Sequence, residues 1–163
     1  MIRIGLISDT HGIILPFVKK ALEDTDEIWH AGDIGGLNVL DELRELKPLR
    51  AVFGNIDDYK VRRECPEYLF FEIENLKVLM MHIGGYPGKY SPEARKLIKE
   101  LKPGLFISGH SHILKVIPDP ANHLLHLNPG ACGKQGMHTR YTLLRFTLDS
   151  GKVTQMEVVE KER

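Results

Sequence analysis

The chain contains few cysteines, and nothing in their spacing pairs them. Its 163 residues include only Cys65 and Cys132, without a Cys-x-x-Cys motif. This excludes a disulfide-stapled scaffold and a thiolate metal cluster, and we expect both thiols to be small buried apolar side chains. Unpaired cysteines also fit a reducing compartment, so a cytoplasmic location is expected.

Long hydrophobic runs and an excess of charge of one sign are absent as well. No stretch approaches the roughly 18 apolar residues of a membrane span, and the seven residues before Ser8 are too few for a signal peptide. The 22 basic and 22 acidic side chains cancel. Arg62 and Arg63 are too few to form a basic groove, so neither a membrane nor a nucleic-acid partner is expected.

The remaining composition is that of an ordinary globular protein, with 42% hydrophobic and 27% charged residues. A chain of this length buries about two-thirds of its unfolded surface around one core. No repeat, low-complexity tract or linker divides it, so residues 1–163 are expected to form a single domain. Homo-oligomerisation is expected only at its general base rate.

Short apolar runs alternate with amphipathic stretches. Apolar runs at 2–7, 27–31 and 50–53 predict buried strands, and leucines spaced by three and four predict helices over 15–22 and 37–46. Further predicted elements are a hairpin (69–73 and 77–81), a helix begun by Ser91 and Pro92, and strands at 105–107, 115–117, 124–127, 141–148 and 153–159. Residues 54–66 and 84–90 are expected to be loops.

This order of elements predicts an α/β fold. Helices follow the early strands, which are expected to be partly parallel, and the later portion is expected to be mixed or antiparallel. We expect a four-layer α/β/β/α sandwich, in which two mixed β-sheets pack face to face and are flanked by helices. A single mixed sheet is the alternative.

Seven side chains able to bind a metal ion occur in five clusters, each just past an apolar run. They are Asp9 and His11, Asp33, Asn55, His82, and His110 with His112. Oxygen and imidazole donors at successive strand ends can converge on two adjacent cations in one crevice. The set lacks thiolate and suits Mn²⁺, Fe, Co²⁺, Ni²⁺ or Zn²⁺. The pattern predicts a metal-dependent hydrolase.

In their order along the chain, these motifs resemble those of the calcineurin-like metallophosphoesterase superfamily, in particular its small bacterial and archaeal phosphodiesterase branch. The turn Asn128-Pro129-Gly130 is similar to a late turn of that branch. The resemblance implies two divalent metal ions, with a leaning toward Mn²⁺. One ion would be held by Asp9, His11, Asp33 and His112, and the other by Asp33, Asn55, His82 and His110.

The resemblance further implies hydrolysis of a phosphodiester bond by a hydroxide that bridges the two ions. Asp33 would bridge the ions, because a carboxylate can bind two cations about 3.5 to 4 Å apart. Asp33 and Asn55 are the expected catalytic residues. The expected substrate is a small phosphodiester or nucleotide-like ester.

One position departs from the wider superfamily, where a histidine that assists the leaving group commonly follows the Gly-Asn pair. Here that residue is Ile56. A general acid contributes about 10² to 10⁴-fold, so its loss favours esters with good leaving groups, such as aryl esters. The role of Asp57, which would orient that histidine, stays open between a loop cap and another function.

A non-catalytic protein-binding scaffold is the alternative function, because some relatives of this fold serve as assembly subunits. No ligand position is empty in this sequence, which favours the enzyme. Among the other histidines, His30 is expected in the core or behind the ligands. His123, His126 and His138 are expected at the surface, although one of them could approach a phosphate from a loop. Lys134 and Arg140 are expected to be solvated.

Overall fold

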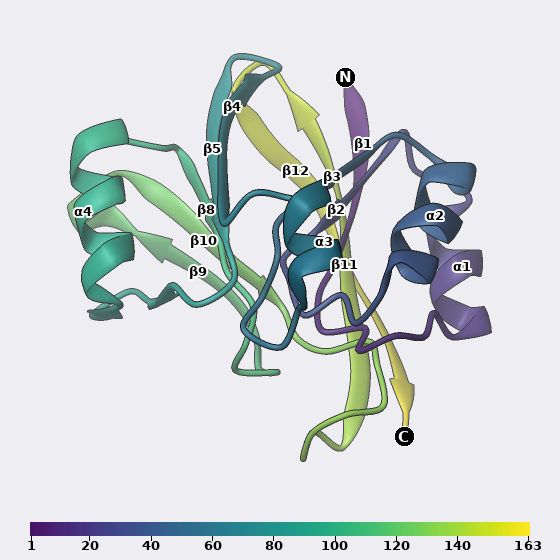
Figure 1. Cartoon of the computed structure of the whole chain (residues 1–163). Coiled ribbons are helices and arrows are strands. Elements are labelled where there is room, and N and C mark those ends of the chain that lie inside the picture. The colour runs from purple at the N-terminus through teal and green to yellow at the C-terminus, as the bar shows by residue number, and fades with distance from the viewer.

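The computed structural model describes residues 1–163, and the chain forms two five-stranded sheets packed face to face (Figure 1). Helices α1 (Pro16–Leu22) and α2 (Leu37–Leu46) cover the outside of one sheet, and α4 (Pro92–Leu101) covers the outside of the other. The predicted four-layer sandwich of two mixed sheets is confirmed. The alternative of a single mixed sheet is wrong.

The first sheet has the strand order β12-β11-β1-β2-β3. Its strands are β1 (Ile2–Ile7), β2 (Glu27–His30), β3 (Leu49–Ala51), β11 (Arg140–Asp149) and β12 (Lys152–Glu162). β1, β2 and β3 are parallel, whereas β11 runs antiparallel to both β1 and β12. The carboxyl ends of the three parallel strands therefore meet at one edge of the sheet.

The second sheet has the order β4-β5-β8-β10-β9. Its strands are β4 (Tyr68–Ile73), β5 (Leu76–Met81), β8 (Leu105–Ile107), β9 (Leu114–Asp119) and β10 (Leu124–Pro129). β5, β8 and β10 are parallel, while β4 and β9 close the two edges in antiparallel pairings. Each sheet thus contains three neighbouring parallel strands, at one side of the first sheet and at the centre of the second. Ligand sites form at the carboxyl ends of such strands.

Two regions expected to be loops contain short regular elements. Helix α3 (Tyr59–Glu64) begins at Asp58, whose carboxylate accepts hydrogen bonds from the backbone N–H groups of Lys60 at 3.1 Å and Val61 at 3.2 Å. Only Val61 of this helix is buried, so apolar periodicity gave no signal for it. Strands β6 (Gly85–Tyr86) and β7 (Lys89–Tyr90) pair within the second predicted loop. A 3₁₀ turn, η1 (Pro120–Asn122), joins β9 to β10.

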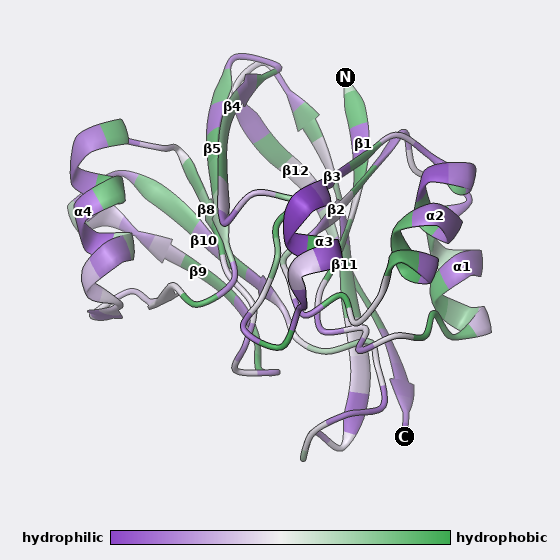
Figure 2. Cartoon of the chain, in the orientation of Figure 1, coloured by the Kyte–Doolittle hydropathy of each residue, from purple (hydrophilic) through white to green (hydrophobic).

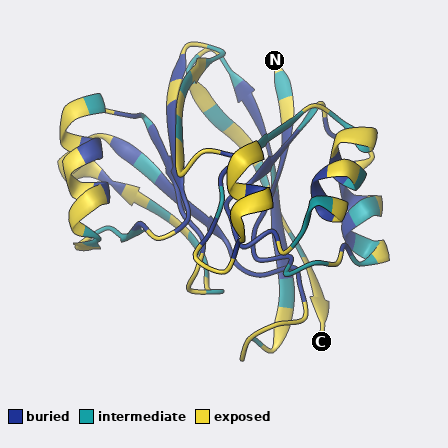
Figure 3. Ribbon diagram, in the orientation of Figure 1, coloured by how far each residue is buried: buried dark blue, intermediate teal, exposed yellow.

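Three apolar clusters fill the three interfaces between the layers. Fourteen buried residues, among them Trp29 and Met80, lie between the sheets. Fifteen join the first sheet to α1, α2 and α3, and seven join the second sheet to α4. The inner strands β1, β5 and β8 are accordingly largely dark blue in Figure 3, whereas the outer faces of the helices are hydrophilic in Figure 2 and exposed in Figure 3. Each fully buried aliphatic or aromatic side chain contributes about 1.5 to 3 kcal/mol, so these layers hold the strand ends in fixed positions.

Helix α4 begins as the sequence predicts. The Ser91 hydroxyl accepts a hydrogen bond from the Ala94 N–H at 3.1 Å, and Pro92 occupies the first turn. Cys65 and Cys132 are both buried and unpaired, as expected. No helix of this fold is both long and apolar enough to cross a membrane.

Candidate metal centre

The seven predicted ligands lie in the loops that follow five strands. Asp9 and His11 follow β1, Asp33 follows β2 and Asn55 follows β3, so the first sheet supplies four of them. The other three come from the second sheet, where His82 follows β5, and His110 and His112 follow β8. The loops of the two sheets face one another, and the side chains gather in two groups.

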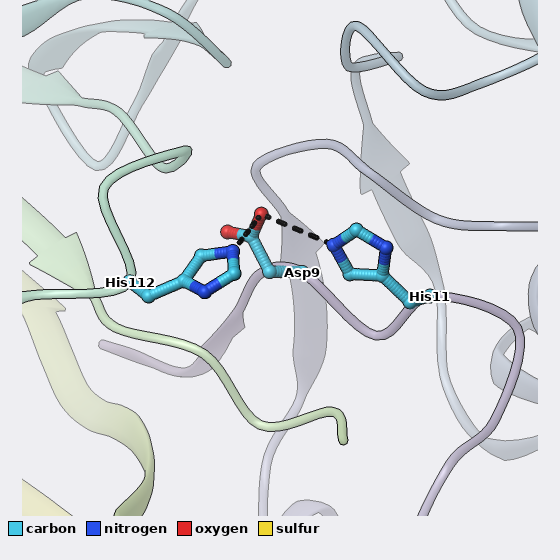
Figure 4. A group of neighbouring side chains, drawn as sticks. All are labelled: Asp9, His11 and His112. Atoms are coloured by element: carbon cyan, nitrogen blue, oxygen red, sulfur yellow. Dashed lines mark ion pairs between the residues drawn. The ribbon is translucent and has the colours of Figure 1, made fainter. Parts of the chain in front are cut away.

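Asp9, His11 and His112 form the first group. The Asp9 Oδ1 atom is 3.7 Å from His11 Nε2 and 3.2 Å from His112 Nε2. Figure 4 shows the carboxylate between the two imidazole rings. Asp9 is fully buried, and its Oδ2 atom accepts hydrogen bonds from the Ser8 hydroxyl at 2.6 Å and the His110 N–H at 3.3 Å. Those contacts fix the carboxylate with Oδ1 toward the imidazoles.

Asp33, His82 and His110 form the second group. The Asp33 Oδ2 atom is 3.2 Å from His82 Nε2. The exposed Asn55 side chain joins this group, because its Oδ1 atom is 3.1 Å from His110 Nδ1. Three of the four predicted ligands of each ion thus cluster together, and Asn55 lies beside the second cluster.

Asp33 lies between the two groups. Its Oδ2 atom is 3.5 Å from His11 Nε2 of the first group, in addition to its contact with His82. Its Oδ1 atom accepts a hydrogen bond from the Ile56 N–H at 3.1 Å. A side chain at Gly54 would collide with this carboxylate, which explains the glycine that precedes Asn55.

Most of these residues adopt a backbone conformation that is unfavourable for side chains. Five of the seven have positive φ angles, namely Asp9 (57°), His11 (48°), Asp33 (55°), His110 (70°) and His112 (62°). Left-handed backbone costs about 1 to 3 kcal/mol at a non-glycine residue and persists only where the surroundings enforce it. Five such residues gathered in the loops after three strands are what a preorganised ligand site requires.

Three buried polar atoms at the centre have no hydrogen-bond partner. They are Asp9 Oδ1, His11 Nε2 and His82 Nε2. His82 Nδ1 is 2.7 Å from the Ala31 carbonyl oxygen, which can only accept, so Nδ1 carries a hydrogen and, in the neutral ring, Nε2 offers its lone pair to a cation. Buried polar atoms are nearly always satisfied. Their lone pairs converge as the donors of a cation site would, so the residues present fit a bound divalent metal.

The charges of the two groups depend on each other. Burial alone would raise the pKa of the Asp9 carboxyl, but the contacts with His11 and His112 outweigh it and hold this pKa well below its ordinary value. The contact with Asp9 raises the pKa of His11. Burial alone would lower the pKa of His82, but the contact with Asp33 outweighs it and raises the pKa. The pKa of Asp33 is lowered as well, because the contact with His82 outweighs burial, so both acids keep the negative charge that a cation site requires.

Asp57 has a definite role behind the ligands. Its buried carboxylate accepts backbone hydrogen bonds from Ile34 at 3.1 Å, Gly35 at 2.8 Å and Gly54 at 2.8 Å. These donors belong to the loop that carries Asp33 and to the one that carries Asn55. Of the two roles left open by the sequence, Asp57 is a loop cap, and it ties two ligand-bearing loops together.

His30 lies behind the centre, as expected. It is fully buried, with Nε2 2.9 Å from the Thr10 hydroxyl oxygen and Nδ1 accepting a hydrogen bond from the Gly32 N–H at 3.1 Å. Burial lowers its pKa to about 4. It is therefore neutral at neutral pH, and it connects the loop of Asp9 to the loop of Asp33.

The later histidines divide into three environments. His123 is exposed, as expected. His126 is fully buried against Phe106, so its expected surface position is wrong. His126 lies on β10, a central strand covered on both faces, and the apolar residues on either side of it in the sequence were the signal for this.

His138 is half-buried, and its ring centroid is 5.1 Å from that of His112. Sequence reasoning did not connect it to any one ligand. Arg163 holds the loop before it by donating to the carbonyl oxygens of Gly136 at 2.6 Å and His138 at 3.0 Å. Lys134 and Arg140 are exposed, as expected.

Comparison with known proteins agrees with this geometry. The calcineurin-like phosphoesterase superfamily domain matches residues 2–151. The probable metallophosphoesterase of Methanothermobacter thermautotrophicus is 37% identical over 136 residues, which cover 78% of this chain and 76% of that protein.

Solved structures share the fold at low sequence identity. Wild-type Vps29 from Entamoeba histolytica, solved in complex with zinc, superposes with a TM-score of 0.75 at 18% identity and covers 98% of each chain. A novel archaeal phosphodiesterase superposes with a TM-score of 0.72 at 21% identity, covering 96% of this chain and 99% of that one. Because the family domain matches most of the length of this chain, the chain belongs to the calcineurin-like phosphoesterase superfamily.

Proposed function

We propose that this protein is a phosphodiesterase that hydrolyses its substrate with two divalent metal ions. The observation that carries the proposal is the convergence of two groups of ligands around Asp33, with buried lone pairs of Asp9, His11 and His82 left without a partner. Membership of a metal-dependent phosphoesterase family supports the same reading. When bound, such ions lower the pKa of water toward neutrality and offset negative charge on phosphate oxygens.

The proposed ligands follow the two groups. Asp9, His11, Asp33 and His112 would hold one ion, and Asp33, Asn55, His82 and His110 the other, with Asp33 shared. Ser8, the Ala31 carbonyl and Asp57 hold these side chains and loops in place. Partners of this kind typically change metal affinity or activity by about 10- to 100-fold when they are removed.

Mn²⁺ is the proposed metal, and Ni²⁺, Fe, Co²⁺ and Zn²⁺ suit the same donors. The ligands are carboxylate, amide oxygen and imidazole, without thiolate, which fits all of these ions. Zinc is the ion found in the Vps29 structure that shares the fold.

Charge favours a phosphodiester as the substrate. The groups contain two carboxylates, Asp9 and Asp33, so two divalent ions leave a small positive excess that suits a singly charged diester. The net charge of zero gives no long-range attraction for nucleic acid, so a small or nucleotide-like ester fits better than a polymer. The archaeal phosphodiesterase with this fold supports the choice of a diester.

The chain offers no proton donor at position 56. Ile56 is 47% exposed and cannot assist a leaving group. We therefore expect turnover to be fastest for esters whose leaving group departs without protonation. Asn55, which lies exposed beside His110, is open to the phosphate and is the proposed catalytic residue together with Asp33.

A protein-binding scaffold is the second candidate. Two observations favour it: Ile56 replaces the usual histidine, and Vps29, a vacuolar protein sorting protein by name, shares the fold. A complete ligand set argues against it, since a scaffold does not need to keep seven metal-binding side chains, five of them on left-handed backbone.

Metal content and turnover separate the two functions. Purified protein loaded with Mn²⁺ is assayed for bound metal and for hydrolysis of bis(p-nitrophenyl) phosphate, before and after chelation. The enzyme predicts about two ions per chain, turnover that chelation abolishes and Mn²⁺ restores, and loss of turnover in Asn55→Ala with an unchanged circular dichroism spectrum. Tight binding of a protein partner without metal-dependent turnover would establish the scaffold instead.

A further inference from the structure

A cleft opens directly beside the second ligand group. It has a volume of about 510 Å³, and Asn55 and His82 form part of its wall. The remaining wall comes from α3 and the segment after it, from the segments that follow β3 and β5, and from the first turn of α4. A substrate whose phosphate lies at Asn55 and His82 would therefore extend one of its groups into this space.

Part of the wall of the cleft is apolar. Phe53, Met81 and Ile83 line it, and Ile83 is 45% exposed although it follows the buried residue His82. Met81 is buried, so the exposed Ile83 and the half-buried Phe53 are the side chains that gain free energy by contact with an apolar or planar group. This wall suits the ring of an aryl group or a nucleoside.

The one cation in the wall is held at the ligand end of the cleft. Arg62 donates through Nε to the Asp57 carbonyl at 2.7 Å and through Nη2 to the Asn55 carbonyl at 3.4 Å, and its guanidinium lies 4.6 Å from the centroid of the Phe53 ring. Nη1 makes no hydrogen bond to the protein. A positive charge is thus fixed next to Asn55, where a phosphate would bind.

Whereas Arg62 lies beside Asn55, two carboxylates, those of Glu67 and Glu93, belong to residues that line the rest of the cleft. Glu67 follows Pro66, whose carbonyl accepts a hydrogen bond from the Phe53 N–H at 3.0 Å. Glu93 lies in the first turn of α4, and Ser91 ties that turn to the Ile83 carbonyl at 3.2 Å. Both glutamates are exposed and line the cleft, so each adds a negative charge to its wall that no ion pair offsets.

We propose that this cleft binds the alcohol group of the ester, and that Glu67 and Glu93 make the enzyme select an uncharged alcohol group, such as a nucleoside, over one that carries a further phosphate. Arg62 faces the phosphate at the reaction centre, and the glutamates repel a second one. Hydroxyl and N–H groups of an uncharged alcohol can instead donate hydrogen bonds to them. This inference rests on the proposed phosphodiesterase activity, and it adds a prediction of which substrates that activity prefers.

Two matched substrates test the selectivity. They are the p-nitrophenyl ester of thymidine 5′-phosphate and the same ester with an additional 3′-phosphate, which differ only in the second charged group. At saturating Mn²⁺ and low ionic strength we expect kcat/KM to be about 10-fold or more higher for the first, since one charge pair a few ångströms apart at a protein surface changes binding by about 3- to 10-fold. The ratio should shrink in about 1 M salt, where screening acts over about 3 Å.

Variants assign the effect to the cleft. Glu67→Gln and Glu93→Gln should each reduce the ratio of kcat/KM between the two thymidine esters by about 3-fold. The reduction should come from a lower KM for the ester that carries the 3′-phosphate. Ile83→Asn should raise KM for both thymidine esters by about 5- to 10-fold with little change in kcat. Glu100→Gln, at the other end of α4 and outside the cleft, is the matched control and should leave the ratio unchanged.

Three results would overturn the inference without touching the proposed function. These are equal kcat/KM for the two thymidine esters, an unchanged ratio in both glutamine variants, and failure to hydrolyse either thymidine ester while bis(p-nitrophenyl) phosphate is turned over. Failure to hydrolyse bis(p-nitrophenyl) phosphate at all would instead remove the proposed function, and the selectivity with it.

Discussion

The two groups of candidate ligands differ in how far they are enclosed. In the first, Asp9 is buried, and the side chains of His11 and His112 are 15% and 19% exposed. The second has two buried members, Asp33 and His82, and two exposed ones, His110 and Asn55, and its residues Asn55 and His82 line the cleft. If both groups hold an ion, as proposed, this difference predicts that the enclosed group would hold its ion more firmly and that the open group would expose its ion to solvent and substrate.

The residue shared by both groups should have the largest effect. Because Asp33 lies against His11 of one group and His82 of the other, Asp33→Ala should disrupt both ion sites at once. Ions of this kind supply several kcal/mol at the reacting centre, so kcat/KM for bis(p-nitrophenyl) phosphate should fall by about 10³-fold or more. Asp41→Ala, an exposed acid on α2, is the control. Activity of Asp33→Ala within 10-fold of wild type would contradict a shared ligand.

Release of metal should distinguish the enclosed group from the open one. When Mn²⁺-loaded protein is mixed with a chelator, we expect two phases, because the ion at His110 and Asn55 is accessible and the ion at Asp9 is not. His110→Ala should lose the fast phase and retain about one ion per chain, as measured by elemental analysis. Simultaneous release of both ions in wild type would show that enclosure does not separate the groups.

Asp57 tests how firmly the open group is supported. Asp57→Asn keeps the shape of the side chain but turns an N–H group toward backbone donors, and leaving such buried donors unpaired should lower the free energy of unfolding by about 3 kcal/mol. Asp58→Asn is the matched control, since asparagine is as good a helix N-cap as aspartate. Chemical denaturation measures both. Equal stability of the two variants would show that Asp57 does not tie the loops together.

A histidine remote from both groups separates acid effects on the fold from effects on the metal centre. Burial lowers the pKa of His126 to about 4 from an ordinary 6.5, so the folded state favours the neutral ring. Below pH 6.5 the unfolded chain binds a proton that the folded chain does not, so stability falls as the pH falls from about 6.5 toward 4.

Between pH 7 and 5 the loss due to His126 should be about 2 kcal/mol. His126→Gln should remove this part of the pH dependence, whereas His123→Gln, at an exposed position, should retain it. The check is the free energy of unfolding of each variant at both pH values. An unchanged slope in His126→Gln would contradict the effect of burial.

The fold and the convergence of the ligands followed from local patterns. Apolar runs ending in Gly-rich turns mark the carboxyl ends of β1, β2, β3, β5 and β8, and parallel strand ends meet at one edge of a sheet. The chain length and the order of the elements then limited the fold to a few layered arrangements. Two packed mixed sheets and a single mixed sheet were among them, and the structure has the first.

Features that depend on tertiary contacts could not be predicted from local sequence patterns. Asp57 collects three N–H groups from residues 34, 35 and 54, and no local pattern indicates that these meet. The cleft forms because α3 and the first turn of α4 lie on either side of it, although the sequence separates them by about 30 residues. Left-handed backbone at Asp9 and Asp33 is likewise imposed by the surrounding loops, since aspartate has no strong preference for it.

Anomalous scattering from a crystal grown with Mn²⁺ tests the central claim most directly. Two peaks about 3.5 to 4 Å apart are expected, on either side of the Asp33 carboxylate, one against Asp9, His11 and His112 and the other against Asn55, His82 and His110. The peak at the enclosed group should keep higher occupancy after a brief soak in chelator. A single peak, or manganese bound away from Asp33, would contradict the account.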